Sequence, residues 1–145
     1  MVDINQFSDT EIIAMTLIGE SESKGHDYMV GTACTLMNRV KANLHWMGGD
    51  TLRGVCLQAN QYDVWLLGAD RDRVIQIATQ NPLYDAYVDA LGIAGQAIDG
   101  KLEDVTRNAV SYYDSDACAE PYWAKGKTPC FTQGARYYFP LSAIL

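Results

Sequence analysis

The feature that most constrains this chain is a segment near its N-terminus that is apolar on nearly every side. Residues Ser8 to Glu11 form a capping-box pattern, in which the Ser8 hydroxyl accepts from the Glu11 amide while the Glu11 carboxylate reaches back. The apolar side chains that follow are Ile12, Ile13, Met15, Leu17 and Ile18. Because they cover most of a helix surface, the pattern predicts a largely buried helix that ends near Gly19-Glu20.

Apolar periodicity predicts further helices downstream. A stripe predicts a helix over residues 27–42, a short helix starts at Asp50-Thr51, and residues 74–78 suggest a helical turn or two. The stripe of the 27–42 helix consists of Met29, Ala33, Leu36, Met37 and Val40, flanked by Val30 and Cys34. Residues 58–65 mix amides with aromatics and show no clean period, which is typical of a loop or short turn.

A long helix is predicted from Asn81-Pro82, with Asn81 as N-cap and Pro82 in the first position, to a stop at Gly100. Its expected buried stripe is Tyr84, Tyr87, Val88, Leu91, Ala94 and Ile98. Gly92 and Gly95 are expected to allow the close approach of another backbone.

After Gly100 the residue types change. Residues 105–113 favour a strand, 117–134 are typical of a loop, and 135–139 predict a last short strand ended by Pro140. The 145 residues show no repeat, linker or low-complexity segment. We therefore expect an α+β fold that is mainly α, with a small C-terminal β or extended part, and one domain over residues 1–145.

Charge and composition exclude several classes of function. The net charge is −7 and the eleven basic residues are scattered, which argues against nucleic acid and anionic lipid as partners. No apolar run has the length of a membrane span, and residues 1–5 show no secretory signal, so we expect synthesis in the cytoplasm and no membrane insertion.

The four cysteines do not indicate a metal site. Cys34, Cys56, Cys118 and Cys130 form no Cys-x-x-Cys pair, and the two histidines lie far from a ligand spacing, so we expect neither metal nor cofactor. Cys34 is expected to be a small buried residue of the second helix. Cys118 and Cys130 could form a disulfide in an oxidising compartment, and reduced thiols are the alternative.

Glu20 is the candidate catalytic residue. A carboxyl group beside apolar surface is disfavoured as an anion, so its pKa rises and a proton stays available for a leaving oxygen. Cleavage of a glycosidic bond needs such a proton donor. The structural alternative is a solvated or capping carboxylate at a helix end, which is the commoner role of a Glu there.

Several short motifs in order resemble the SleB/CwlJ-type cell-wall hydrolase family. Gly19-Glu20 is followed eighteen residues after the glutamate by Asn38-Arg39, and then by the stretch Gln58-Ala59-Asn60-Gln61-Tyr62. Later positions that match are Asp104-Val105-Thr106, Ala109, Tyr112-Tyr113 and Trp123. The match extends over residues 11–139. Ser23, Lys24 and Tyr28 depart from residues that are frequent in the family.

The resemblance implies a lysozyme-like fold and cleavage of the bond between N-acetylmuramic acid and N-acetylglucosamine in peptidoglycan. It implies a lytic transglycosylase, in which Glu20 acts as acid and then as base and the product ends in 1,6-anhydromuramic acid. A bacteriophage endolysin or virion-associated hydrolase fits the small size. We expect a monomer that needs a holin or another delivery route and acts at the cell wall.

The same resemblance suggests roles for further side chains. Gln61 and Tyr62 could contact sugar, and Tyr112, Tyr113 and Trp123 could line the cleft; a loop amide and core aromatics are the structural alternatives. Asn38 and Arg39 are expected to support the site, Asn38 by bonding loop backbone and Arg39 by pairing with a carboxylate.

Two other functions stay open at this point. A hydrolytic N-acetylmuramidase would need a second carboxylate, for which Asp63 and Asp114 are the candidates, although a turn-forming Asp is the alternative for both. A non-catalytic glycan-binding or virion-structural protein that keeps the fold is the other.

Overall fold

Helix α1 (Asp9–Ser21) is the central element of the computed structural model, which describes residues 2–59 and 61–145. Asn60, part of the motif around Gln61, lies outside the described residues, as does Met1. The predicted capping box is present: Ser8 N donates to Glu11 Oε1 at 2.9 Å and Glu11 N donates to Ser8 Oγ at 3.1 Å. All seven residues from 12 to 18 are buried, which confirms a helix enclosed on every side.

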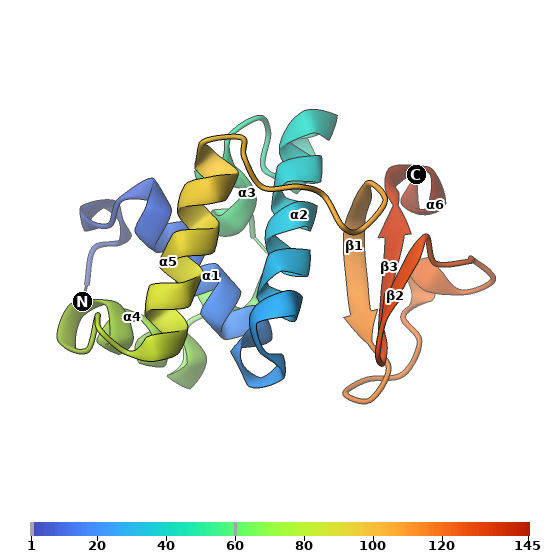
Figure 1. Cartoon of the computed structure of the whole chain (residues 1–145). Helices are drawn as coiled ribbons and strands as arrows, with labels where there is room; N and C mark the ends of the chain where they lie inside the picture. The colour runs from blue at the N-terminus through green and yellow to red at the C-terminus, as the bar shows by residue number, and fades with distance from the viewer. Residues whose placement is uncertain (1, 60) are drawn as a thin grey trace.

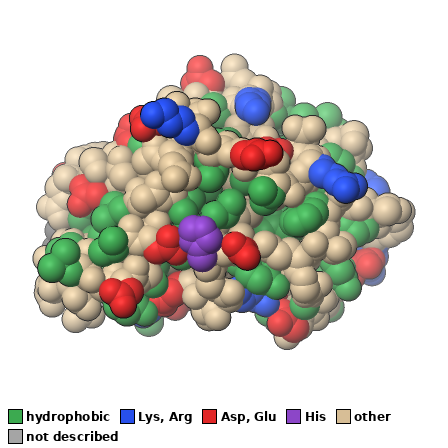
Figure 2. Space-filling view, in the orientation of Figure 1, with side chains coloured by type: hydrophobic (Ala, Val, Ile, Leu, Met, Phe, Trp, Pro, Cys, Tyr) green, Lys and Arg blue, Asp and Glu red, His purple; other side chains and the backbone are tan. Residues whose placement is uncertain are grey.

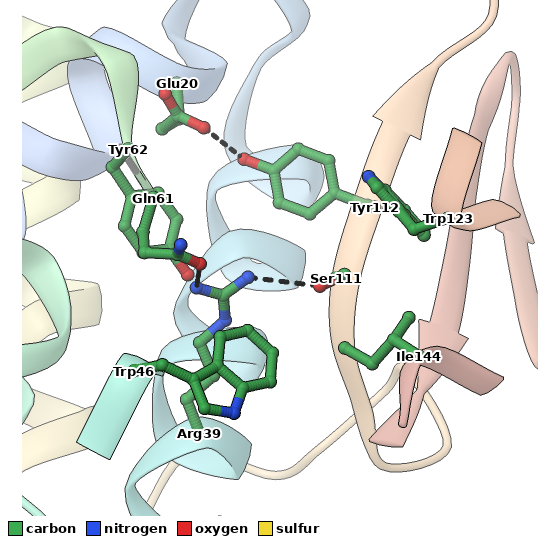
Figure 3. A pocket seen from close by; sticks show the side chains of 9 residues that line it. All are labelled: Glu20, Arg39, Trp46, Gln61, Tyr62, Ser111, Tyr112, Trp123 and Ile144. Atoms are coloured by element: carbon green, nitrogen blue, oxygen red, sulfur yellow. Dashed lines mark hydrogen bonds between the residues drawn. The ribbon is translucent and has the colours of Figure 1, made fainter. Parts of the chain in front are cut away.

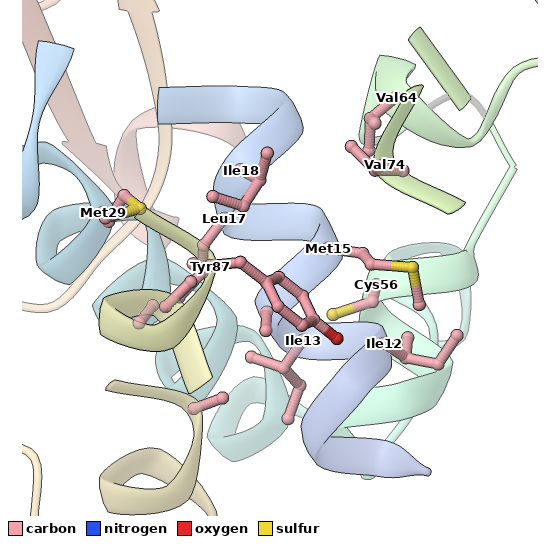
Figure 4. Close-up of a cluster of buried hydrophobic side chains, with 14 of the residues drawn as sticks. Ile12, Ile13, Met15, Leu17, Ile18, Met29, Cys56, Val64, Val74 and Tyr87 are labelled. Atoms are coloured by element: carbon pink, nitrogen blue, oxygen red, sulfur yellow. The ribbon is translucent and has the colours of Figure 1, made fainter. Parts of the chain in front are cut away.

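Four helices surround α1. They are α2 (His26–Ala42), α3 (Leu52–Leu57), α4 (Ala69–Gln80) and α5 (Asp85–Ile98), and Figure 1 shows α5 in front of α1 and α2 between α1 and the strands. Short 3-10 turns lie at Ile4–Gln6, Glu22–Lys24, His45–Met47, Asp63–Trp65 and Tyr122–Ala124. Figure 4 shows the core that these helices form around the side chains of α1, with Tyr87 of α5 and Cys56 of α3 among them.

A small antiparallel sheet lies beside α2, on the side away from α1 (Figure 1). Its strands β1 (Ala109–Asp114), β2 (Phe131–Gln133) and β3 (Arg136–Pro140) lie in the order β1-β3-β2, and a short helix α6 (Leu141–Ile144) follows. Tyr112 pairs with Tyr138 across β1 and β3. Gly31 of α2 permits the contact with β3, because a Cβ there would overlap the Tyr138 hydroxyl. The expected mainly α, α+β fold is confirmed.

The predicted start of the long helix is wrong. Asn81 N donates to Ile77 O at 2.9 Å and so caps the end of α4, and α5 begins at Asp85. The buried residues of α5 are Tyr87, Ala90, Ile93, Ala94 and Ala97. Val88 and Ile98, predicted to be buried, are 48% and 43% exposed. A Cβ added at Gly92 or Gly95 would meet no atom within 4 Å, so neither glycine mediates a close backbone contact.

Other expectations are corrected more lightly. The helical turn predicted at residues 74–78 lies within α4, a 12-residue helix, and the short helix α6 adds an element that the sequence pattern does not predict. Gly100, with φ of +71°, ends α5 as expected. Cys34 is buried as predicted. Cys118 and Cys130 are free thiols that donate to the Asp114 and Thr106 carbonyls at 3.5 and 3.3 Å.

Basic side chains are scattered over the face of the molecule that Figure 2 shows. On the face that Figure 2 shows, Lys and Arg side chains are separated by acidic, apolar and neutral groups. Over residues 2–59 and 61–145, no helix combines the length and the hydrophobicity needed to cross a bilayer. Within the same ranges, no three His, Cys, Asp or Glu side chains are grouped as metal ligands.

Candidate active site

A cleft of about 430 Å³ lies between the helices and the sheet. Figure 3 shows the side chains that line it: Glu20, Arg39, Trp46, Gln61, Tyr62, Ser111, Tyr112, Trp123 and Ile144. They come from α1, α2, β1 and α6, from the 3-10 turns at His45–Met47 and Tyr122–Ala124, and from the segment before the turn at Asp63–Trp65. The cleft therefore brings together six of the eight residues predicted for the site, with Asn38 and Tyr113 outside its lining.

Glu20 lies in the last turn of α1 and points at the sheet (Figure 3). Tyr112 Oη of β1 donates to Glu20 Oε1 at 2.8 Å. The preceding Gly19 is required by packing, because a Cβ at that position would overlap the side chain of Val64. The Gly-Glu pair thus lets the end of α1 lie against the 3-10 turn at Asp63–Trp65 while its carboxylate faces the cleft.

The pKa of Glu20 is raised above its ordinary value of 4.5, chiefly because burial disfavours the anion. The hydrogen bond from Tyr112 opposes this rise, and the nearby negative charge of Asp63 adds to it. Burial wins, so the carboxyl keeps its proton to higher pH than an exposed Glu would. This is the electrostatic property that a general acid for glycosidic cleavage needs.

A chain of hydroxyl groups holds Tyr112 as a donor. Thr32 Oγ1 donates to Tyr112 Oη at 3.2 Å, and Thr32 Oγ1 itself lies 2.7 Å from Ser21 Oγ. Burial and the neighbouring Glu20 raise the pKa of Tyr112 well above its usual value. Tyr112 therefore stays protonated and donates toward Glu20 across the working pH range.

Arg136 of β3 anchors this chain, although the sequence pattern gives its side chain no part in the site. It is fully buried and forms a two-pronged pair with Asp114, with Nε–Oδ1 at 2.7 Å and Nη2–Oδ2 at 3.1 Å. It also donates to Ser21 Oγ at 2.9 Å and covers the Tyr112 ring, 4.1 Å from its centroid. Both oxygens of the Asp114 carboxylate thus have Arg136 as a partner, and Lys24 Nζ lies 3.8 Å from Oδ1 as well.

Asn38 and Arg39 join α2 to β1 rather than to the end of α1. Asn38 Nδ2 donates to the Ala109 carbonyl at 2.8 Å and to Asp104 Oδ2 at 3.2 Å. Arg39 Nε donates to the Val110 carbonyl at 2.6 Å. Asn38 was expected to bond loop backbone, but its backbone partner is Ala109 of strand β1. Arg39 was expected to pair with a carboxylate, but it forms no ion pair with any carboxylate of residues 2–59 and 61–145.

The remaining predicted residues divide between the cleft and other places. Gln61 and Tyr62 line it, and Gln61 Oε1 accepts from Arg39 Nη1 at 2.8 Å. Trp123 lines its sheet side. Tyr113 does not, because it alternates with Tyr112 on β1 and packs among Trp123, Tyr137 and Phe139. Asp63 is exposed and outside the lining, although its charge acts on Glu20.

Three lining residues were missed by sequence reasoning: Trp46, Ser111 and Ile144. Trp46 is 45% exposed, which is unusual for so large an aromatic group, and its position after the second helix was the available signal. Ser111 and Ile144 carry no local signal, because only the folding of the sheet against α2 brings them to the cleft.

Comparison with known proteins identifies the class. The cell wall hydrolase family model matches residues 22–139, so the chain belongs to the cell wall hydrolase family. The solved catalytic domain of the germination-specific lytic transglycosylase SleB from Bacillus anthracis has a similar fold, with a TM-score of 0.66 and 21% identity over 94% of this chain and 99% of that one. A comparison with curated protein sequences gives no match.

These findings confirm the expected SleB/CwlJ-type family and the lysozyme-like fold. They also confirm the expected class of protein, a peptidoglycan-cleaving enzyme. The family match begins at residue 22, two residues after Glu20, so the assignment of Glu20 rests on the geometry described above.

Proposed function

We propose that this enzyme is a lytic transglycosylase that cleaves the bond between N-acetylmuramic acid and N-acetylglucosamine, with Glu20 as its single acid and base. One observation carries the proposal. Among the described residues that line the cleft, Glu20 is the only carboxyl group, and burial raises its pKa. A hydrolytic mechanism of the usual kind needs two carboxylates, whereas an intramolecular attack needs one.

The reaction begins with proton transfer from Glu20 to the glycosidic oxygen. Because Oε1 accepts the hydrogen bond from Tyr112, Oε2 is left to carry the proton. As the bond from C1 of the muramic acid to that oxygen breaks, the departing sugar takes the proton. Glu20, now a carboxylate, accepts the proton of the C6 hydroxyl, whose oxygen forms the new bond to C1. The ring closes as a 1,6-anhydro sugar and Glu20 regains its proton.

The other lining residues fit a polysaccharide substrate. Trp46 and Trp123 offer aromatic faces for the C–H surface of a pyranose, and Gln61 offers an amide for N-acetyl groups. Tyr62 and Tyr112 shape the floor next to Glu20. In this proposal Asn38 is a positioning residue, because it fixes β1 through the Ala109 carbonyl. Tyr113 lies outside the cleft and has no part in it.

Hydrolysis by water is the second candidate function. The observation that favours it is the effect of the Asp63 charge on Glu20. That charge contributes to the raised pKa of Glu20, so the two carboxyl groups lie close enough to interact. Asp114 does not fill this role, because Arg136 and Lys24 occupy its oxygens. A water molecule activated by Asp63 would give a reducing muramic acid end in place of the anhydro end.

The biological setting is proposed from the cell-wall-cleaving activity and from the small size of the chain. We propose that residues 1–145 act as one catalytic domain, as a monomer, in a bacteriophage endolysin or a virion-associated wall hydrolase. A holin or another delivery route would bring the protein to the wall.

Mass spectrometry of soluble products from purified peptidoglycan tests the proposal. Muropeptides that end in 1,6-anhydromuramic acid are expected, and Glu20→Gln should lower their rate of release by about 10²–10⁴-fold, the usual contribution of acid–base catalysis. The matched control is Glu120→Gln, an exposed Glu outside the cleft, which should keep full activity.

The alternative outcomes are distinct. Reducing ends would establish hydrolysis and direct attention to Asp63. Near-native turnover by a folded Glu20→Gln protein would overturn the role of Glu20. No soluble product from the unaltered protein would favour a glycan-binding or virion-structural role.

A further inference from the structure

Arg39 is a buried cation in the cleft wall whose neighbours are neutral. Only 6% of the residue is exposed. Its partners are a backbone carbonyl, the Gln61 amide, the Ser111 hydroxyl and the ring of Tyr62, 5.1 Å from the guanidinium carbon to the centroid. No Asp or Glu in residues 2–59 or 61–145 forms an ion pair with it.

The second buried arginine of the site shows what a fully satisfied guanidinium looks like here. Arg136 is fully buried and holds the two oxygens of Asp114 with two of its nitrogens. Burying a charge is unfavourable unless an opposite charge and hydrogen bonds offset the loss of water. The fold supplies that counter-charge to Arg136, and the described residues do not supply it to Arg39.

The hydrogen bonds of Arg39 leave two donors uncommitted among the described residues. A guanidinium carries five N–H groups. Nε donates to the Val110 carbonyl at 2.6 Å, Nη1 to Gln61 Oε1 at 2.8 Å and Nη2 to Ser111 Oγ at 3.1 Å. One N–H therefore remains on each terminal nitrogen. Two such donors on one planar group match the two oxygens of a carboxylate.

The position of Arg39 makes these donors available to a substrate. Arg39 belongs to the lining of the same cleft as Glu20, and Figure 3 shows its guanidinium between Gln61 and Ser111 in the wall. Its contacts with Gln61 and Ser111 hold the plane of the group in place. A neutral N-acetyl group would leave the charge uncompensated, whereas a carboxylate would compensate it.

We propose that Arg39 binds a carboxylate of the glycan substrate and thereby selects acidic muramic acid units. The inference rests on the proposed function. Two sources in peptidoglycan offer this chemistry: the lactyl carboxylate of a muramic acid whose stem peptide has been removed, and a carboxylate of an intact stem peptide. Arg39 is thus a specificity residue that acts on the substrate directly.

Binding to the unaltered protein tests the proposal without any variant. Three ligands are compared by titration calorimetry or NMR: N-acetylmuramic acid, its lactyl methyl amide, and N-acetylmuramoyl-L-alanyl-D-glutamate. The better of the two acidic ligands should bind at least about tenfold more tightly than the methyl amide, because a hydrogen bond to a charged partner is stronger than one to a neutral partner. The preference should shrink as salt is added.

The three ligands also separate the two sources. Tight binding of the free acid with weak binding of both amides assigns the lactyl carboxylate. Weak binding of the methyl amide with tight binding of the muramoyl dipeptide assigns a stem carboxylate. Equal binding of all three, or no binding of any at millimolar concentration, would overturn the proposal.

Variants distinguish recognition from a structural role. Arg39→Gln should remove the preference for the acidic ligand over the methyl amide, and Arg39→Lys should restore part of it through charge alone. The control is Arg107→Gln, which removes the same charge from an exposed site. A structural role would weaken all ligands equally and leave the preference unchanged, which would contradict the proposal. If Arg39→Gln fails to fold, the titrations of the unaltered protein still decide.

A failure here is separable from a failure of the proposed function. If anhydro products form and Glu20→Gln abolishes them while neither acidic ligand is preferred, lytic cleavage stands and the role of Arg39 falls. If no product forms but an acidic ligand binds preferentially, the carboxylate site stands in a protein that does not cleave.

Discussion

Apolar packing holds the helical region together, whereas buried polar contacts attach the sheet to it. The main apolar core takes its buried members from residues 7–94, and none of those described comes from a strand. The sheet buries Ala109, Val110, Tyr138 and Phe139 outside this core, and Tyr138 lies against Gly31 of α2. The candidate cleft lies between these two regions, with Glu20 on the helical side and Tyr112 on the sheet side.

Buried polar groups connect the sheet to the helices. Arg136 donates to Ser21 at the end of α1, Arg39 and Asn38 donate to the carbonyls of β1, and Tyr28 Oη donates to the Gln133 carbonyl at 3.0 Å. Apolar packing tolerates small changes by local rearrangement, whereas a buried charge without its partner does not. The position of Tyr112 beside Glu20 therefore depends on these polar contacts, whereas the position of Glu20 itself depends on the apolar packing of α1.

The largest effect is expected for Asp114→Ala. The substitution leaves Arg136 buried without its carboxylate, so the free energy of unfolding should fall by about 3–5 kcal/mol. Urea unfolding followed by circular dichroism measures it.

The matched control is Asp116→Ala, which removes a carboxylate whose side chain is 58% exposed and whose partner is Lys24. A surface pair of this kind contributes about 1 kcal/mol or less. If Asp114→Ala and Asp116→Ala lowered the free energy of unfolding equally, the buried pair of Asp114 with Arg136 would contribute no more than the surface pair of Asp116 with Lys24.

An intermediate effect is expected for Gly19→Ala on the helical side. The new methyl group overlaps Val64, so the free energy of unfolding should fall by about 1–3 kcal/mol, and the displaced Glu20 should lower turnover. Gly92→Ala in α5 is the matched control, because nothing lies within 4 Å of the new methyl group. That variant should be stabilised by about 0.5–1 kcal/mol. Thermal unfolding and activity of both variants measure the contrast, and a harmless Gly19→Ala would contradict the packing argument.

The same contrast explains what the sequence could predict. The buried helix α1 and its cap can be predicted because they depend on residues close together in the chain. For the same reason the sequence places the carboxyl group of Glu20 in the last turn of that helix. The start of α5 was misplaced because Asn81-Pro82 is a helix-start signal, yet here Asn81 ends the preceding helix.

The polar connections could not be predicted, because they join distant residues without a local pattern. Tyr112 and Glu20 are 92 residues apart, and Arg136 and Ser21 are 115 apart. A single buried Arg in a strand looks like a surface residue in the sequence, and its role depends on which side chains surround it after folding. Resemblance to a family indicated Tyr112 and Arg39, but only the packed structure assigns their partners.

The smallest effect on stability, and the most direct test of the contact between the two regions, is expected for Tyr112→Phe. The Tyr112 hydroxyl donates to Glu20 and favours the ionised carboxylate, so its removal should raise the pKa of Glu20 further. A general acid is active while protonated, so the alkaline limb of the pH profile of kcat/KM should move to higher pH. The loss of one hydrogen bond should lower the free energy of unfolding by about 0.5–1.5 kcal/mol.

Tyr113→Phe is the control for that variant, since it makes the same change at the next position of β1, which does not belong to the cleft lining. Its alkaline limb should coincide with that of the unaltered protein. A limb that moves to lower pH in Tyr112→Phe would mean that the hydroxyl stabilises the protonated acid instead. Tyr112 Oη would then accept a hydrogen bond from the protonated Glu20 carboxyl, and the sheet would hold the acid in its active state rather than oppose its raised pKa.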